Sequence, residues 1–251
     1  MALLEIRGLT KKFFGLTALD SVDIDVERGD LVSLIGPNGS GKTTLFNCIT
    51  GFMEPDAGKV YFRDQDITGL PAHKIALLGM YRTFQQARIF GQLTVFENLL
   101  MGLQQHQGDS TVDRILHTRK ARRLEKEAAE RAEELMAFVS LAHLRDEPAQ
   151  NLSYGQYKLL VFAAGLMSDP EILLLDEPAA AINPTMINAM KEHMVNLNEA
   201  GKTIFFIEHN MEVVMDICDR IIVLDAGAKI AEGPPEAIQN DERVMEAYFG
   251  R

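Results

Sequence analysis

A glycine-rich segment followed by lysine and threonine is the strongest chemical signal in the chain. Residues 31–46 read LVSLIGPNGSGKTTLF and satisfy the pattern G-x-x-x-x-G-K-[ST] between an apolar strand and a helical run. The glycines let the backbone curl so that successive N–H groups point at one phosphate chain. An ordinary glycine-rich turn would match this pattern by chance in about one chain per hundred of this size, and the strand and helix context lowers that further. The segment therefore predicts a nucleotide site formed by Gly36, Pro37, Asn38, Gly39, Ser40, Gly41, Lys42, Thr43 and Thr44.

Within this site, two side chains have distinct expected tasks. Lys42 would reach the β and γ phosphates, and the Thr43 hydroxyl would ligate Mg²⁺.

Acidic residues follow a second apolar segment, EILLLDEP, at residues 171–178. A buried strand here delivers Asp176 to its carboxyl end, where ligands bind in such sheets. Asp176 is expected to hold Mg²⁺ through its coordination shell, and Glu177 to polarise an attacking water as general base. An Asp-Glu pair after a strand is weak evidence alone, but the phosphate loop upstream makes it strong.

The segment IFFIEHN at residues 204–210 repeats this arrangement, because an apolar strand ends in Glu208 and His209. A single histidine at a strand end is more often structural. Here the strand is expected to lie in the same sheet as the acidic pair, so we predict that His209 contacts the γ-phosphate.

The elements that must position these residues predict an α/β fold. Three β-rich segments, 3–13, 16–27 and 59–67, are expected to form an antiparallel sheet. The short apolar strands near residues 30–36, 171–176, 203–209 and 220–227 suit a parallel sheet covered on both faces.

The middle of the chain differs, since residues 95–165 contain no convincing strand. Residues 113–141 are charged and strongly helical, and their mixed charges favour a solvated surface over a binding site. Apolar residues recur at three- and four-residue spacing and would form one face of a helix: Leu124, Ala128, Ala132, Leu135, Met136 and Val139. We interpret this part as a helical arm inserted into the α/β core.

Composition excludes several classes of protein. The chain has 251 residues, 47% of them hydrophobic and 24% charged, which is typical of a globular protein of one large or two small domains. Its net charge of −11 disfavours nucleic acid and direct docking on an anionic membrane. Cys48 and Cys218 lack metal or redox spacing and are expected to be small buried hydrophobes.

No membrane anchor is expected in the chain itself. The N-terminus is charged by its fifth residue, and the longest apolar run spans about nine residues near 159–167, well short of the ~20 needed to cross a bilayer. Any membrane association is therefore expected to run through another protein.

A polar box, LSYGQ at residues 152–156, opens an almost wholly apolar helix in which Lys158 is the single charge. Helix starts with spare N–H groups favour anions. The ordered set of the phosphate loop, Gln85, this box, ILLLDEP and His209 resembles the ATP-binding cassette family, and the resemblance covers essentially the whole chain.

That resemblance implies a P-loop NTPase (RecA-like) core with an N-terminal antiparallel β-subdomain and an inserted α-helical subdomain. We expect a single domain over residues 1–251. Residues 1–90 and 166–251 would form the catalytic core, and residues 91–165 the helical signature subdomain.

The resemblance also implies further site residues and two cofactors, ATP and Mg²⁺. Phe14 matches the aromatic residue that stacks on adenine, with Phe13 as the alternative if the register differs by one. Gln85 matches a glutamine that contacts Mg²⁺ and the attacking water. Ser153, Gly155 and Gln156 belong to a signature box that binds the γ-phosphate held by the opposite subunit, so two chains must close head to tail.

The chain departs from the family pattern at three positions. Tyr154 replaces a glycine of the signature box, which is tolerable if its side chain points away from the phosphate. Ala164 stands where an arginine is usual and makes the helix more apolar. Asn183 replaces an aspartate in the loop that crosses the dimer; it keeps a hydrogen-bonding group but no charge.

Motifs that are less specific than the catalytic ones favour one branch of the family. RTFQ, LTVFENLLMG, DEPAAAINP and the ending AEGPPEAIQNDERVMEAYFG are similar to the ATPases of branched-chain amino acid importers, and they overlap with urea and amide importers. Residues 87–100 would line the cleft for a membrane subunit, although ordinary packing explains any one of them equally well.

This resemblance implies a location in the cell and a set of partner proteins. The expected partners are a second ATPase subunit, identical or different, integral membrane permease subunits and, indirectly, a periplasmic or extracellular solute-binding protein. The chain would act at the cytoplasmic face of the inner or plasma membrane, without nucleic acid.

Two non-transport functions remain as alternatives. DNA-repair cassettes are usually split by a long coiled coil, whereas the helical segment here has about 30 residues, and the acidic charge disfavours DNA. Translation-factor cassettes normally occur as two in one chain. A kinase or small GTPase explains neither LSYGQ nor the glutamate after Asp176.

Overall fold

The computed structural model describes residues 2–83, 89–103 and 119–249. These residues form two compact units. The first comprises residues 1–85 and 171–251, and the second comprises residues 86–170. Each unit is built from a different kind of element, and each is described by itself.

An antiparallel sheet forms the N-terminal part of the first unit. It contains β1 (Ala2–Phe13), β2 (Leu16–Glu27), β4 (Ala57–Phe62) and β5 (Gln65–Asp66), in the order β2-β1-β4-β5. The predicted antiparallel sheet is confirmed, but the single strand expected over residues 59–67 is wrong. Arg63 and Asp64 adopt φ values of 51° and 61°, and two such residues make the tight turn of a hairpin.

A six-stranded sheet carries the predicted site. Its order is β10-β9-β3-β8-β7-β6, with β3 (Leu31–Ile35), β6 (Met80–Arg82), β7 (Ile172–Asp176), β8 (Thr203–Ile207), β9 (Arg220–Asp225) and β10 (Ala228–Gly233). The four predicted strands pair in parallel, as expected. The sequence analysis missed β6 and β10, of which β10 pairs antiparallel with β9.

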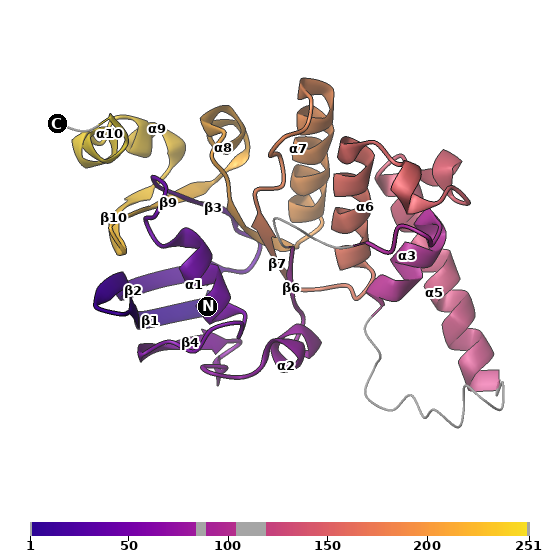
Figure 1. The fold of residues 1–251 in the computed structure, drawn as a ribbon, viewed down its shortest axis with the longest axis horizontal. Coiled ribbons are helices and arrows are strands. Elements are labelled where there is room, and N and C mark those ends of the chain that lie inside the picture. The colour runs from indigo at the N-terminus through magenta and orange to yellow at the C-terminus, as the bar shows by residue number, and fades with distance from the viewer. Residues whose placement is uncertain (1, 84–88, 104–118, 250–251) are drawn as a thin grey trace. The chain divides into compact units, whose positions relative to one another are not determined.

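Helices complete the first unit, and one of them contributes to its core. They are α1 (Lys42–Ile49), α2 (Ala72–Leu77), α7 (Pro184–Glu199), α8 (Met211–Ile217), α9 (Pro235–Gln239) and α10 (Glu242–Phe249). Figure 1 shows α1 between the two sheets. Its Phe46 is fully buried and lies 5.0 Å from Phe205 of β8, ring centre to ring centre. Apolar side chains of both sheets and α1 thus share one core.

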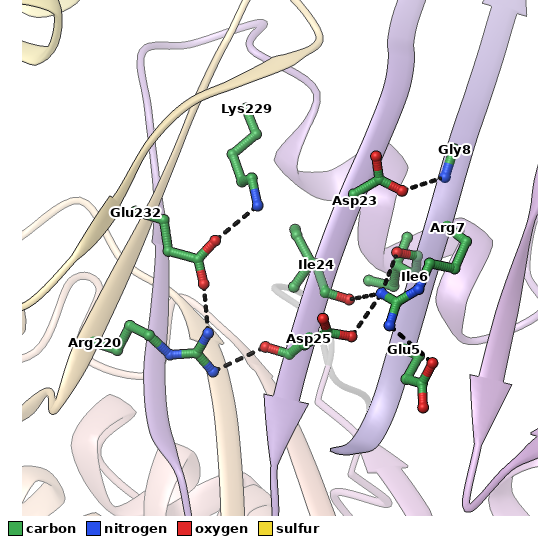
Figure 2. Close-up of polar contacts among 10 residues, drawn as sticks. All are labelled: Glu5, Ile6, Arg7, Gly8, Asp23, Ile24, Asp25, Arg220, Lys229 and Glu232. Carbon is green, nitrogen blue, oxygen red and sulfur yellow. Dashed lines mark hydrogen bonds and ion pairs between the residues drawn. The ribbon is translucent and has the colours of Figure 1, made fainter. Parts of the chain in front are cut away.

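A charged network joins β2, at the edge of the antiparallel sheet, to β9 and β10 of the six-stranded sheet (Figure 2). The guanidinium of Arg220 on β9 pairs with Glu232 of β10 and donates to the Asp25 carbonyl of β2 at 2.8 Å. On the other side of β2, Arg7 of β1 pairs with the Asp25 carboxylate at 2.6 Å. Because Arg220 is three-quarters buried at its side chain, these bonds fix the two sheets to each other more firmly than surface pairs would.

The second unit is helical, as predicted. It contains α3 (Val95–Gly102), α5 (Arg119–Phe138), two 3₁₀ turns (Ala142–Leu144 and Ala149–Asn151) and α6 (Tyr154–Leu166), and residues 89–103 and 119–170 hold no β-strand. The predicted apolar face is confirmed toward the C-terminal end of α5, where Ala132, Leu135 and Met136 are buried, as is Val139 just after the helix. Leu124 and Ala128, nearer the start of the helix, are only half-buried. Among the residues that the structure describes, no helix has the length and apolar character needed to cross a membrane.

Both cysteines are buried thiols, as the sequence analysis expected. Burial raises the pKa of Cys48 to about 11 and also raises the pKa of Cys218. Neither thiol is therefore prepared for nucleophilic or redox chemistry at neutral pH.

Candidate functional site

The phosphate loop connects β3 to α1 at the carboxyl end of the parallel strands. Helix α1 begins at Lys42, and its N-cap Gly41 has a φ of 104° and no side-chain cap. A side chain at Gly36 would overlap the carbonyl oxygen of Leu224, and one at Gly41 would meet the Ala18 carbonyl oxygen at 2.5 Å. The loop can follow this path only with glycine at both positions, and the uncapped helix end suits a phosphate.

Lys42 lies along this loop with its ammonium group buried. Its Nζ donates to the carbonyl oxygens of Gly36 at 2.7 Å and Pro37 at 2.9 Å. Burial lowers the pKa of Lys42, and the nearby carboxylates of Glu177 and Asp176 raise it in part. The cation is thus held between the loop and the two acidic residues, where a negative ligand would meet it.

A cavity of about 360 Å³ opens over the loop. Its lining combines loop backbone, an aromatic ring, an acid and a histidine: Phe13, Leu16, Ala18, Asn38, Gly39, Gly41, Lys42, Thr43, Thr44, Glu177, Ile207 and His209. The structure therefore brings together the predicted lysine, threonine, glutamate and histidine from three separate segments of the chain.

Of the two aromatic residues predicted for adenine, the geometry favours Phe13. Phe14 and Gly15 form the two-residue turn between β1 and β2, with φ values of 44° and 92°. The Phe14 side chain is fully exposed at the tip of this turn, whereas Phe13 lines the cavity. The Phe-Gly pair is the signal in the sequence that could have indicated the turn.

Asp176 ends β7 in a buried ion pair that the sequence analysis missed. Its Oδ2 lies 3.2 Å from Nη2 of Arg82 on β6, and both side chains are more than nine-tenths buried. Arg82 also donates to Asn47 Oδ1 at 2.8 Å and to Thr50 Oγ1 at 3.0 Å, both on the α1 side of the site. The arginine thus ties the predicted metal-binding aspartate to the helix that follows the phosphate loop. Arg82 is the first residue of the RTFQ motif, but that motif did not predict the contact with Asp176.

Removing this arginine is expected to destabilise the fold. Arg82→Met would remove the cation that pairs directly with the buried Asp176 carboxylate, at a cost of about 3–5 kcal/mol. Urea unfolding of the full chain measures this change. The double variant Arg82→Met/Asp176→Asn should lose less than the sum of the single changes, because both charges of the buried pair are then gone. A single-variant loss below about 0.5 kcal/mol, typical of surface positions, would contradict the assignment.

Glu177 and His209 face each other across the ends of β7 and β8. His209 Nε2 lies 3.1 Å from Glu177 Oε1. Glu177 has a φ of 51° and its N–H donates to the Ile207 carbonyl at 2.9 Å. A glutamate in this left-handed region costs roughly 1–3 kcal/mol and persists where the surroundings impose it, which happens most often at functional sites.

The signature box lies in the second unit and starts α6. Ser153 Oγ accepts from the Gln156 N–H at 3.3 Å, and Gln156 Oε1 accepts from the Ser153 N–H at 2.9 Å, which forms a capping box. Tyr154 is half exposed and stacks on Tyr157, with ring centres 6.1 Å apart. Gly155 sits in the first turn of the helix.

A side chain at Gly102 of α3 would overlap the backbone carbonyl of Ala164, so the two helices approach closely there. This contact involves the backbone of residue 164, and nothing in the structure explains why alanine replaces arginine. Asn183 caps α7 by accepting from the Met186 N–H at 2.9 Å, which is a task that an aspartate would perform equally well.

Two predictions involve residues outside the described part of the chain. Gln85 lies among residues 84–88, and its role stays a prediction. Of the segment 87–100 that was predicted to line a cleft for a membrane subunit, residues 89–100 are described, and their contact with a partner also stays a prediction.

The phosphate loop, the neighbouring acidic strand ends and the inserted helical unit define an ATP-binding cassette ATPase. A family profile described as ABC transporter matches residues 19–180, and the chain belongs to this family. A second profile, described as branched-chain amino acid ATP-binding cassette transporter, matches residues 228–251.

Relatives point to one branch of this family. The chain is 43% identical to the high-affinity branched-chain amino acid transport ATP-binding protein BraF of Pseudomonas aeruginosa, over 99% of this chain and 98% of that protein. It has the same identity and coverage with LivG of Escherichia coli K12, which carries the same description. The chain is thus an ABC ATPase homologous to the ATP-binding proteins of branched-chain amino acid importers.

Solved structures agree with the fold. The ADP conformation of an ATP-binding cassette of an ABC transporter matches with a TM-score of 0.87 and 36% identity, over the whole of both chains. A dimeric cassette bound to ADP and phosphate matches with a TM-score of 0.77 and 26% identity, over 92% of this chain and 98% of that one. These matches confirm the predicted P-loop fold.

Proposed function

We propose that this chain is the ATP-hydrolysing subunit of an importer for branched-chain amino acids. The observation that carries the proposal is the 43% identity with BraF and LivG across almost the full length of all three proteins. The match of residues 228–251 to a branched-chain transporter profile supports it independently of the catalytic motifs.

In this proposal, ATP occupies the cavity above the phosphate loop. Lys42 and the N-terminus of α1 hold the phosphates, Phe13 and not Phe14 stacks on adenine, and Glu177 acts as general base beside His209. The donors near the phosphates fit Mg²⁺, because a hydroxyl and a carboxylate are the oxygen ligands that this ion takes together with phosphates. Thr43, Asp176 and Gln85 would hold it.

The site requires further protein partners. A second ATPase chain would contribute Ser153, Gly155 and Gln156 of its signature box to the γ-phosphate, with Asn183 in the loop that crosses the dimer. We place the pair at the cytoplasmic face of the membrane, bound to integral permease subunits that receive solute from a binding protein.

The substrate is tested by uptake in cells that lack the gene. The uptake rate of labelled leucine, isoleucine and valine is expected to fall to the background rate that does not depend on ATP. The reason is that closure of the ATPase pair drives the import step. The wild-type gene should restore uptake, and a Glu177→Gln gene should not. Urea and a sugar serve as control solutes and should enter at the normal rate.

Two results would change the assignment. Normal amino acid uptake together with lost urea uptake would move the chain to the urea importers. Normal uptake of every solute would contradict an importer function.

A further inference from the structure

Glu208 has no role in the proposed reaction, yet its side chain is almost completely buried, with 2% of the residue exposed. It lies directly after β8, between Ile207, which lines the cavity, and His209. The sequence analysis placed Glu208 at the end of a strand and predicted no role for it. A buried carboxyl group needs hydrogen-bond partners to offset its lost hydration.

Three backbone N–H groups converge on the Glu208 carboxylate from two different loops. Its Oε2 accepts from Ala179 at 3.1 Å, in the loop that follows Glu177. Its Oε1 accepts from His209 at 2.9 Å and from Asn210 at 3.2 Å, in the loop that follows β8. One side chain therefore joins the segment that carries Glu177 to the segment that carries His209.

The two loops hold the pair of side chains that faces the cavity. Glu177 is kept in its left-handed conformation, and its carboxylate lies 3.1 Å from His209. The ladder bond from the Glu177 N–H to the Ile207 carbonyl fixes only the base of the first loop. Farther along this loop, the bond between Ala179 and Glu208 connects it to the neighbouring strand end.

We propose that Glu208 is a positioning residue for ATP hydrolysis, which sets the relative placement of Glu177 and His209 through the backbone of both loops. The proposal rests on the roles proposed for these two residues. Glu208 does not line the cavity and would not touch ATP. Its effect should appear in turnover, because a small displacement of a catalytic group costs far more in rate than in ground-state binding.

Glutamine is the most informative substitution for Glu208. A carboxylate accepts with both oxygens, whereas glutamine has one acceptor and an amide that only donates. Glu208→Gln therefore keeps size and burial but turns a donor toward N–H groups of one of the two loops. Glu208→Asp keeps both acceptors on a side chain shorter by one methylene.

The test measures ATP hydrolysis, ATP affinity and urea unfolding of the full chain. In Glu208→Gln, kcat is expected to fall about 10- to 100-fold while KM and Kd for ATP stay within about twofold. Glu208→Asp should recover part of the lost kcat. The matched control is Asp30→Asn, which removes a carboxylate that accepts from the Glu27 N–H at 2.9 Å before β3, at the opposite end of the parallel strands.

Asp30→Asn is expected to lower stability and leave kcat unchanged. An unchanged kcat in Glu208→Gln would overturn the proposal, as would an equal loss of kcat in both variants, because the effect would then follow stability alone. A Glu177→Gln variant measured beside them distinguishes a failure of the proposed base, Glu177, from a failure of the positioning role of Glu208. If Glu177→Gln turns over normally, the assigned base is wrong; if it is inactive while Glu208→Gln is normal, only the positioning role fails.

Discussion

Glu177→Gln is expected to lower ATP turnover by about 10²–10⁴-fold, the usual contribution of a general base, while ATP binding is retained. The change keeps the length and shape of the side chain but removes its basicity. The cavity lining is otherwise intact, and the Lys42 ammonium stays on the phosphate loop. The expected result is therefore a large loss in kcat with little change in the affinity for ATP.

This prediction is checked by steady-state hydrolysis with Mg²⁺ and by titration of a fluorescent ATP analogue. Glu171→Gln is the matched control, since Glu171 immediately precedes β7, at the end opposite Glu177, and pairs there with Arg28 at 2.7 Å. It should leave turnover unchanged. Wild-type turnover in Glu177→Gln would show that another group is the base.

Lys42→Ala is expected to weaken ATP binding by roughly 100-fold or more and to abolish turnover with it. Charge-assisted hydrogen bonds contribute about 1.5–3 kcal/mol each, and one ammonium can bond two phosphates at once. The residue is buried on the loop, so no solvent cation easily replaces it. The loss is expected in affinity as well as rate, unlike the loss in Glu177→Gln.

Equilibrium titration with ATP measures this loss. Lys59→Ala is a suitable control because Lys59 pairs with Asp66 at 2.8 Å through exposed side chains of the antiparallel sheet, where ion pairs contribute little. Retained ATP affinity in Lys42→Ala would remove the phosphate-loop assignment.

The same variant tests whether the site is shared between chains. Mixing Lys42→Ala with Ser153→Arg would place both lesions in one composite site of a closed pair and leave the other intact. Partial recovery of hydrolysis is expected on mixing. Inactive mixtures over a wide range of concentrations would argue against a signature box that acts on the partner's nucleotide.

Local patterns in the sequence determined much of this protein. The spacing of Gly36, Gly41 and Lys42 between an apolar strand and a helical run specifies a phosphate loop, because the glycines let the backbone curl around a phosphate chain. Apolar runs identified the four parallel strands, and three- and four-residue spacing identified the buried face of α5. These features depend on neighbours in the chain, so the sequence displays them directly.

Tertiary structure alone decided the contacts between distant segments. The pair of Arg82 and Asp176 spans 94 positions, and the bond from Ala179 to Glu208 spans 29. Both depend on which strands lie side by side, and β6 is too short at three residues to be recognised by periodicity. The choice between Phe13 and Phe14 depended on a turn conformation. Strand order and turn geometry arise from packing of the whole unit, which no local pattern encodes.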